Sequence, residues 1–376
     1  ISIEPIKNLV LKTQAGIQYG VNESEQKTLP SFVLIQTGQP VGSTSYTRRG
    51  STKKINNTFT NTMEYRFTLQ NKHYFTALMG QESVRQMIKW FDAVRYGMPL
   101  DELSMLSNGT RSFGTPVNDS KSVRTFNSLF GRIEYEYNNK YFLDISGRRD
   151  GSSIFGRNNR YANFWAIGGM WKISSEPFLK DVKWLTNLSL RASTGLSGNP
   201  AGGDYAHLTI VNTAIYNGGT SYSILSSAIG NPDLAWEKQQ KTTIGLSGRL
   251  FDNTSFSIEY YSRITRGMLL ASYINSMSGA SANFTDNAGD FENRGFDLTI
   301  NSTVYQNREH NVSIRPYLNL NYNDQRVRAL ADGKDQLVGV NSGNYAYQTG
   351  SPVYWALPIF KGINPDNGHP EWYLPN

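Results

Sequence analysis

The sequence predicts an all-β fold, in which this chain contributes about 11 strands to a transmembrane antiparallel β-barrel. Three observations lead to this prediction. Apolar and polar residues alternate with a period of two along most of the chain, which is typical of strands with two different faces. Short turns and long loops alternate between those strands. Aromatic residues crowd the strand ends beside the short turns.

The composition agrees with this fold class. Aromatic residues make up 12% of the chain, there are 34 glycines, and only 18% of residues are charged. This is too aromatic for a disordered chain, and it lacks the Ala, Glu, Lys and Leu excess of a helical bundle. No apolar run approaches the ~18 residues of a membrane-spanning helix, whereas barrel strands need only one apolar face.

The predicted strands follow one another along the chain. In the segment 129–137, Leu129, Ile133 and Tyr135 alternate with Arg132 and Glu134, so the two sets lie on opposite faces. The same alternation recurs in each of the other segments. The predicted spans are 8–19, 58–70, 73–80, 124–137, 140–149, 160–175, 184–196, 239–251, 254–269, 290–305 and 311–323. Pro316 removes a ladder donor, so the last span should contain a local defect.

The connections between the strands differ in length. Short turns are expected at Asn71–Lys72, Asn138–Asn139, Phe178–Lys183, Asp252–Asn253 and Gln306–His310. Long loops are expected at 20–57, 81–123, 197–238 and 270–289. Outer-membrane barrels have short periplasmic turns and long extracellular loops, so the sequence predicts that topology here.

The two faces of the strands have different expected environments. In a membrane barrel the charged face lines the lumen and the apolar face meets lipid. The predicted lumen-facing residues are Arg132, Glu134, Asp144, Arg191, Glu259, Asp297 and Arg315. The aromatic residues expected in an interfacial girdle are Tyr135, Tyr137, Tyr141, Phe251, Phe256 and Tyr260.

The sequence offers little catalytic chemistry. The absence of cysteine excludes disulfides, thiolate zinc sites, iron–sulfur clusters and cysteine nucleophiles. No two of the 4 histidines have the spacing of metal ligands, and no nucleophile elbow or phosphate-binding loop occurs. The net charge of +7 is spread along the chain, so nucleic acid is not an expected partner. We therefore expect no catalytic residues, no metal site and no cofactor.

The long loops carry the candidate binding residues. The spacing of Val84, Met87, Ile88, Phe91 and Val94 predicts an amphipathic helix over 82–96. Its apolar side would pack against the same loop or dock a partner. Aromatic side chains stack on sugars and on peptides, and the candidate substrate-binding residues are Trp90, Tyr205, Tyr222, Tyr345 and Tyr347.

Several segments in a fixed order resemble one known family. They are Asn127–Arg132 (NSLFGR), Tyr141–Asp144 (YFLD), Arg149–Ser153 (RDGSS) with Phe155, Trp171–Phe178 (WKISSEPF), Leu190–Asn199 (LRASTGLSGN), Asn231–Lys238 (NPDLAWEK), Asn293–Asp297 (NRGFD), Gly362–Gly368 (GINPDNG) and Trp372–Tyr373. Together they are similar to SusC/RagA-type TonB-dependent outer-membrane transporters. The resemblance implies that residues 1–376 are part of one barrel domain of about 22 strands, with the plug domain, the TonB box and the final strands outside this chain.

The resemblance also implies a function. Members of this family are outer-membrane nutrient importers of Gram-negative, Bacteroidetes-like cells, energised through TonB. They take up oligosaccharides or oligopeptides delivered by a SusD-like surface lipoprotein that acts as a lid, so this chain would not be an enzyme. A passive porin, which would not depend on TonB, is the first alternative. A barrel-borne enzyme, which would show a His/Asp/Ser set at one rim, or a surface adhesin is the second.

Overall fold

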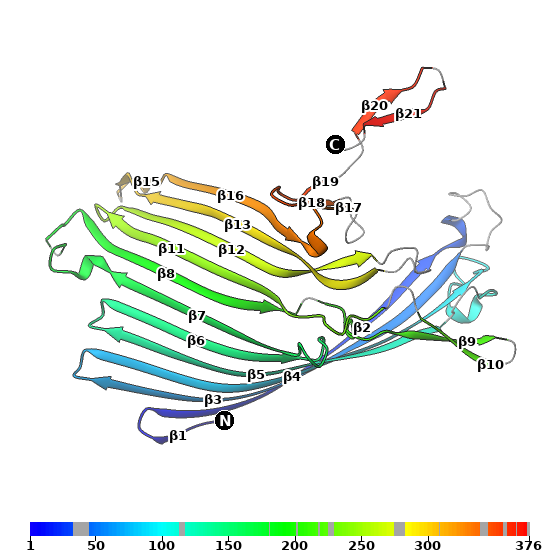
Figure 1. Ribbon diagram of the computed structural model, residues 1–376, viewed down its shortest axis with the longest axis horizontal. Coiled ribbons are helices and arrows are strands. Elements are labelled where there is room, and N and C mark those ends of the chain that lie inside the picture. Colours follow the sequence, from blue (N-terminus) through cyan, green and yellow to red (C-terminus); the bar gives the residue numbers. More distant parts are fainter. Residues whose placement is uncertain are drawn as a thin grey trace. The chain divides into compact units, whose positions relative to one another are not determined.

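The computed structural model describes residues 1–32, 45–112, 117–179, 181–200, 202–216, 219–224, 229–273, 283–307, 309–338, 345–355, 359–365 and 367–373. Most of these residues belong to one antiparallel sheet, in which each long strand pairs with the next long strand of the chain (Figure 1). In sheet order its strands are β1 (Ser2–Ile6), β2 (Leu9–Thr28), β3 (Tyr46–Leu69), β4 (His73–Tyr96), β5 (Val117–Tyr137), β6 (Tyr141–Ser152), β7 (Tyr161–Lys172), β8 (Leu185–Asn199), β11 (Glu237–Leu250), β12 (Thr254–Tyr273), β13 (Asn283–Ser302) and β16 (Tyr317–Leu330).

Smaller elements occupy the connections. The hairpins are β9 (Val211–Tyr216) with β10 (Gly219–Ile224), β14 (Tyr305–Asn307) with β15 (Val312–Ile314), and β20 (Ile359–Ile363) with β21 (Pro370–Tyr373). A three-stranded sheet contains β17 (Gln336–Val338), β18 (Tyr345–Gln348) and β19 (Tyr354–Trp355). The 3₁₀ turns include η1 (Leu106–Asn108), η2 (Ile173–Ser175) and η4 (Ala331–Gly333). Among the described residues, no helix is long and apolar enough to cross a membrane.

The chain forms two compact units. The first contains Ile1, Lys12–Asn61 and Gln81–Asn127. The second contains Ser2–Leu11, Thr62–Gly80 and Ser128–Asn376. The second unit includes most of the predicted charged and apolar positions, and the site described below lies entirely within it.

All eleven predicted strands are present, and β1 is an additional strand that the sequence pattern did not indicate. Several strands continue into the segments expected to be loops. Strand β2 runs on to Thr28, β3 begins at Tyr46, and β5 begins at Val117. The connections are therefore shorter than predicted, because the extended segments pair with one another beyond the region where apolar and polar residues alternate.

The predicted helix over 82–96 is wrong. Strand β4 continues through this segment to Tyr96. Many of its residues, such as Val84, Ile88 and Phe91, favour strands as well as they fit a helical stripe. Pairing with neighbouring strands provides backbone hydrogen bonds along the whole segment, and it overrides the three-and-four spacing.

Three of the short turns have left-handed backbone at both central residues. Asn138 and Asn139 have φ values of 50° and 56°, as a type I′ hairpin turn requires, so this predicted turn is confirmed. In two other hairpins the turn lies one residue earlier than predicted. Its central residues are Gln70–Asn71 in one and Phe251–Asp252 in the other. Asparagine tolerates this conformation better than most side chains, whereas Phe251 has no such advantage.

Pro316 falls at the predicted defect. Strand β15 ends at Ile314 and β16 begins at Tyr317, so the proline interrupts the paired segment. Its carbonyl still accepts a hydrogen bond from the Ser302 backbone at 3.0 Å. The chain can therefore continue along β13 after the break, because only the donor of a proline is missing.

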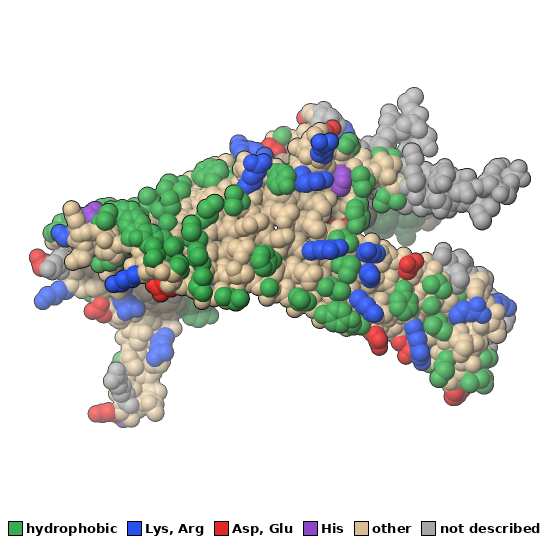
Figure 2. All heavy atoms as spheres, turned by 90° about the horizontal axis from the view of Figure 1, so that it is seen from below, with side chains coloured by type: hydrophobic (Ala, Val, Ile, Leu, Met, Phe, Trp, Pro, Cys, Tyr) green, Lys and Arg blue, Asp and Glu red, His purple; other side chains and the backbone are tan. Residues whose placement is uncertain are grey.

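The register of the sheet separates two faces within the second unit. On one face a row of apolar residues runs across strands β7 to β16. Its members are Trp171, Leu190, Leu246, Ile258, Leu298 and Leu320. We call this the apolar face. Many of its side chains are exposed, and Figure 2 shows hydrophobic side chains gathered in a surface band near the end that carries the short turns. The opposite face, which we call the polar face, carries the charged residues.

An aromatic row lies on the apolar face beside the short turns. Ring centroids are 4.7 Å apart for Phe67 and Phe75, 4.8 Å for Phe75 and Tyr135, and 6.1 Å for Tyr137 and Tyr141. The row crosses β3 to β6 and continues to Trp171 on β7. Side chains of this kind fit a boundary between an apolar and a wet zone.

The Glu176 carboxylate anchors this row from the turn after η2. It accepts hydrogen bonds from the Tyr141 hydroxyl at 2.7 Å, from Lys140 Nζ at 3.1 Å and from the Trp171 indole at 3.2 Å. These contacts, that of Tyr141 first, hold the pKa of Glu176 below its usual range. The carboxylate therefore stabilises the fold while it is ionised.

Replacing Glu176 with Gln is expected to lower the thermal unfolding temperature at pH 7. A depressed pKa gives stability that is present above the unfolded value of about 4.3 and lost as the pH falls through the folded value. The difference between wild type and variant should therefore shrink as the pH falls below about 4.3 and through the lowered pKa of folded Glu176. Unfolding of the full-length protein in detergent, followed from pH 3 to 8, measures this. Glu309→Gln is the control, because that carboxylate accepts no hydrogen bond from the described residues. A pH-independent difference would contradict the ionic role of Glu176.

The loop-length asymmetry predicts the orientation of the chain. A cysteine at Asn253, in a short turn, should be protected from an impermeant thiol reagent on whole cells. A cysteine at Ser221, in β10, should be labelled. Both should react after cell lysis, and the reverse pattern on whole cells would invert the topology.

Candidate functional site

The polar face brings charged side chains of several strands into one row. Arg191 on β8 pairs with Gly245 on β11, which pairs with Glu259 on β12. Glu259 pairs with Asp297 on β13, and Asp297 pairs with Asn321 on β16. Asp297 also accepts a hydrogen bond from the Asn321 side chain. The register therefore places three of the predicted lumen residues on one face.

Arg132 joins two carboxylates on the same face. Its Nε donates to Asp144 Oδ2 at 2.5 Å across the β5–β6 pair, and its Nη2 lies 2.7 Å from Glu134 Oε1. All three side chains are partly exposed to solvent, so the ion pairs contribute little to stability. Their effect is to fix the direction of the Arg132 guanidinium.

A pocket of about 520 Å³ lies on the polar face. Its charged lining residues are Arg132, Glu134, Glu136, Asp144, Arg191 and Glu259. Its other lining residues include Tyr74, Phe142, Met170, Ser193 and Thr243. The predicted charged residues thus meet aromatic and hydroxyl groups that sequence reasoning did not assign to the site.

Two glycines form the floor of this pocket. Gly168 lies between Asp144 and Ser193 in the register, and Gly245 lies between Arg191 and Glu259. A side chain at Gly245 would project toward the Glu259 carboxylate, whose Oε2 is 3.7 Å from the Cβ position. Because glycine has no side chain, these two positions leave space between the charged residues on either side. Only the cross-strand register could have identified these two positions.

The pocket can bind a ligand that carries both signs of charge. Among the described residues, the side chain of Arg191 contacts Ser247 Oγ alone, from Nη2 at 3.5 Å, so its guanidinium keeps donors for a carboxylate. Glu259 and Glu136 can accept from an ammonium or hydroxyl group. Within the described ranges, no three His, Asp or Glu side chains are close enough to share a metal ion.

The remaining predicted lumen residue, Arg315, lies elsewhere. It lines a groove at the turn end of β11 to β16, together with Arg249 and Tyr317. The break at Pro316 separates it from the regular alternation of β16. It does not line the 520 Å³ pocket.

The five aromatic candidates do not line that pocket either. Trp90 lies on strand β4 and is exposed, Tyr205 lies in the segment between β8 and β9, and Tyr222 lies on β10. Tyr345 stacks on Trp355 with centroids 4.3 Å apart. Tyr347 packs against the buried pair Leu270 and Ala288, and this burial raises its pKa.

The comparisons with known proteins agree with the strand order and the two faces. A family model described as "TonB dependent receptor-like, beta-barrel" matches residues 7–371. The chain belongs to this family. The TonB-dependent receptor family consists of outer-membrane β-barrel proteins, so the predicted fold class and location are confirmed.

Relatives within the family support the SusC/RagA resemblance. TonB-dependent receptor P39 of Formosa agariphila is 29% identical over 94% of this chain and 33% of its own length. TonB-dependent receptor SusC of Bacteroides thetaiotaomicron is 32% identical over 58% of this chain and 22% of its own. The solved structure of the RagAB peptide transporter has a TM-score of 0.84 at 31% identity, covering all of this chain and 41% of that one. This chain therefore spans a third of the first curated relative and about two fifths of the solved structure.

More distant structures share only the fold. The outer-membrane transporter YddB of Escherichia coli has a TM-score of 0.58 at 13% identity. The fold can thus be kept while the sequence changes almost completely.

Proposed function

We propose that this chain is part of the wall of a TonB-energised outer-membrane importer that takes up nutrient oligomers. The observation that carries the proposal is the pair of faces on one sheet. The apolar face suits lipid, while the polar face holds a charged pocket floored by glycines. A transporter of this kind binds and releases its cargo without bond chemistry, so the chain is not proposed to be an enzyme.

The polar face favours oligopeptides over oligosaccharides as the cargo. A peptide carries amide groups, both charged termini and charged side chains. The arrangement of Arg191 beside Glu259, with Arg132 beside Asp144, provides partners for both signs of charge. A neutral glycan would need aromatic platforms and amides more than paired charges. The likeness to the RagAB peptide transporter, at 31% sequence identity, supports the same choice.

A SusD-like lipoprotein lid is proposed as the partner on the long-loop side. The segment 97–112, which follows β4, is one candidate contact. Leu100, Leu103 and Met105 are about half exposed there, whereas Met98 is buried. Exposed apolar side chains in a loop outside the cell favour a protein contact. The segment 82–96 is not part of this surface, because it belongs to β4.

Filling the pocket should block uptake. We expect Gly245→Phe in the full-length protein to reduce uptake of a fluorescent charged oligopeptide at least ~10-fold in whole cells, because a side chain there would occupy the space between Arg191 and Glu259. Gly147→Phe is the matched control, since nothing lies within 4 Å of its Cβ position. Heat stability of both barrels is measured in parallel. Unchanged uptake in a stable Gly245→Phe protein would contradict a role of the pocket in cargo passage.

Deleting the gene for TonB distinguishes an energised importer from a passive porin. Wild-type uptake should fall to background in cells without TonB or with a collapsed proton-motive force. Uptake that continues at the same rate would support a passive porin.

A neutral oligosaccharide of similar size serves as the second cargo. Preferential uptake of that oligosaccharide would overturn the peptide assignment.

A further inference from the structure

The apolar face of β13 and β16 changes character along the strands. Its successive cross-strand pairs, starting from the turn end, are Ile300 with Leu318, Leu298 with Leu320, Phe296 with Tyr322, Arg294 with Asp324, and Glu292 with Arg326. Two aliphatic pairs are thus followed by a stacked aromatic pair, with centroids 5.7 Å apart, and then by two ionic pairs. Lipid-facing surfaces of membrane proteins show the same order, from hydrocarbon through interface to headgroups.

The spacing also fits a membrane boundary. Val304, which is 63% exposed, is an apolar residue near the short β14–β15 hairpin. From Val304 to Arg294 the chain advances about 33 Å along the strand. A strand tilted by about 45° converts this to a height of about 23 Å, close to the ~25 Å apolar band of a membrane barrel. Arg294 therefore lies where the apolar band ends, on the side of the long loops.

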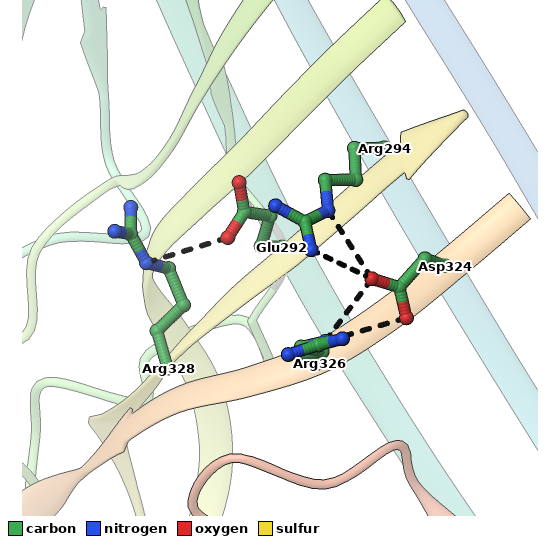
Figure 3. Close-up of polar contacts among 5 residues, drawn as sticks. All are labelled: Glu292, Arg294, Asp324, Arg326 and Arg328. Atoms are coloured by element: carbon green, nitrogen blue, oxygen red, sulfur yellow. Dashed lines mark hydrogen bonds and ion pairs between the residues drawn. The ribbon is translucent and has the colours of Figure 1, made fainter. Parts of the chain in front are cut away.

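Five charged side chains lie near one another at this level, in two groups of ion pairs (Figure 3). Arg294 donates from Nε and Nη2 to Asp324 Oδ2, both at 3.1 Å, and Arg326 Nε lies 3.0 Å from the same oxygen. Arg328 Nε lies 3.6 Å from Glu292 Oε2. With three guanidinium groups and two carboxylates, the cluster has one positive charge in excess. We call it the arginine cluster.

The contacts of Arg326 and Arg328 involve Nε alone. Their terminal amino groups therefore have no protein partner among the residues that the structure describes. The two side chains are 52% and 47% exposed, whereas Asp324 and Glu292 are 21% and 20% exposed. The carboxylates thus hold the arginine stems close to the sheet, and the unpaired donors remain accessible. A planar guanidinium with free donors matches the oxygen geometry of a phosphate.

A second cation occurs on the same face of other strands. The Arg149 guanidinium on β6 lies 5.3 Å from the centre of the Tyr161 ring on β7. Arg149 is eight residues beyond Tyr141, the aromatic residue at the short-turn end of β6. Strand β6 thus shows the same order of residues, with an aromatic residue at the turn end, then an apolar stretch, then a cation. Among the described residues, Arg149 makes no contact with the arginine cluster.

We propose that the arginine cluster binds the phosphate groups of a phosphorylated glycolipid headgroup in the outer leaflet of the membrane. The arginine cluster adjoins the apolar face on the same two strands, so we expect the phosphate to belong to a lipid. A headgroup bound there would have its acyl chains against Leu298, Leu320 and the other aliphatic side chains of the same two strands. Binding places Arg326 and Arg328 on the phosphate, with Arg294 supporting them through Asp324. No transport step is involved, so the proposal does not depend on the cargo.

The test uses the full-length protein in detergent. It is titrated with bisphosphorylated lipid A, with the same lipid after enzymatic removal of both phosphates, and with inorganic phosphate as a competitor. Bound lipid is counted by native mass spectrometry. The double variant Arg326→Gln/Arg328→Gln removes the free donors. The double variant Arg249→Gln/Arg263→Gln is the matched control, with the same charge change on β11 and β12 at positions of the polar face.

The expected result is that removal of the phosphates weakens binding to wild type at least ~10-fold, and that the Arg326/Arg328 variant weakens binding of the intact lipid about as much. The control variant should bind like wild type. If wild type binds intact and dephosphorylated lipid equally well, the proposal is wrong. This comparison needs no variant, so the proposal can be tested even if the double variant does not fold. Equal binding by a folded double variant would also overturn it. Displacement of the lipid by millimolar inorganic phosphate would show a site for a free anion and exclude the lipid assignment.

Discussion

Trp236→Ala is expected to lower the free energy of unfolding by about 3–5 kcal/mol, which is the usual cost of removing a buried aromatic side chain. Trp236 is 6% exposed and packs against Phe155, with ring centroids 4.9 Å apart, and against Phe164 at 5.5 Å. Its indole donates to the Arg160 carbonyl at 3.2 Å. The substitution removes packing on two sides and one hydrogen bond.

The surroundings cannot collapse into the space that Trp236 leaves. Gly156 lies so close to Pro232 that a Cβ there would be 2.2 Å from the Pro232 carbonyl oxygen. Asn159 Nδ2 donates to the Asp233 carbonyl at 2.7 Å. These contacts fix the Asn231–Lys238 segment against the segment after β6, and a rigid cavity is more costly than one that relaxes.

The measurement is denaturant unfolding of the refolded full-length protein in lipid vesicles. Trp165→Ala is the matched control, because Trp165 is 47% exposed on the apolar face and its loss leaves no cavity. We expect this control to lose clearly less stability than Trp236→Ala, because it leaves no cavity. Equal losses for the two variants would mean that Trp236 has no special structural role.

Ile258→Arg is expected to lower the free energy of unfolding in vesicles by about 2–4 kcal/mol. Ile258 lies in the middle of the apolar row, paired with Leu246 and Leu298, and it is 46% exposed. If the apolar face meets lipid, the substitution places a guanidinium in hydrocarbon. The nearest polar boundary is several residues away along the strand.

Ser257→Arg provides the matched control for this prediction. Ser257 is the adjacent residue on the polar face, paired with Ser247 and Thr299. An arginine there would reach the wet interior and should cost less than about 1 kcal/mol. A larger loss for Ser257→Arg than for Ile258→Arg would mean that the lipid and lumen faces are reversed.

The sequence alone predicts the strands because their period of two is strong. A strand such as β6 alternates residue by residue in both chemistry and exposure, and its turn Asn138–Asn139 has the residues that a type I′ turn needs. The error at 82–96 has the opposite origin. Residues such as Val84, Met87 and Phe91 fit a helical stripe by their spacing, but pairing partners far along the chain decide the conformation.

The pocket can be predicted only in part. Charged residues such as Arg191 and Glu259 are recognisable as members of one face, because alternation assigns a face to each residue. Which of them lie side by side depends on the register between strands. That register includes a shift between Ser247 and Arg249 that no local pattern indicates. The glycine floor and the arginine cluster both follow from register, so both had to come from the structure.

The β9–β10 hairpin lies between β8 and β11 in the chain, yet β8 and β11 pair directly from Asn199 and Glu237 onward. The two strands therefore pair from the first residue on either side of an insertion of more than thirty residues. Since lengthening a connection costs little once its two ends are held together, such segments can be gained, lost or exchanged between lineages while the sheet stays the same. Selection for a new nutrient can then act on the inserted segments between paired strands, and the membrane-embedded strands need not change.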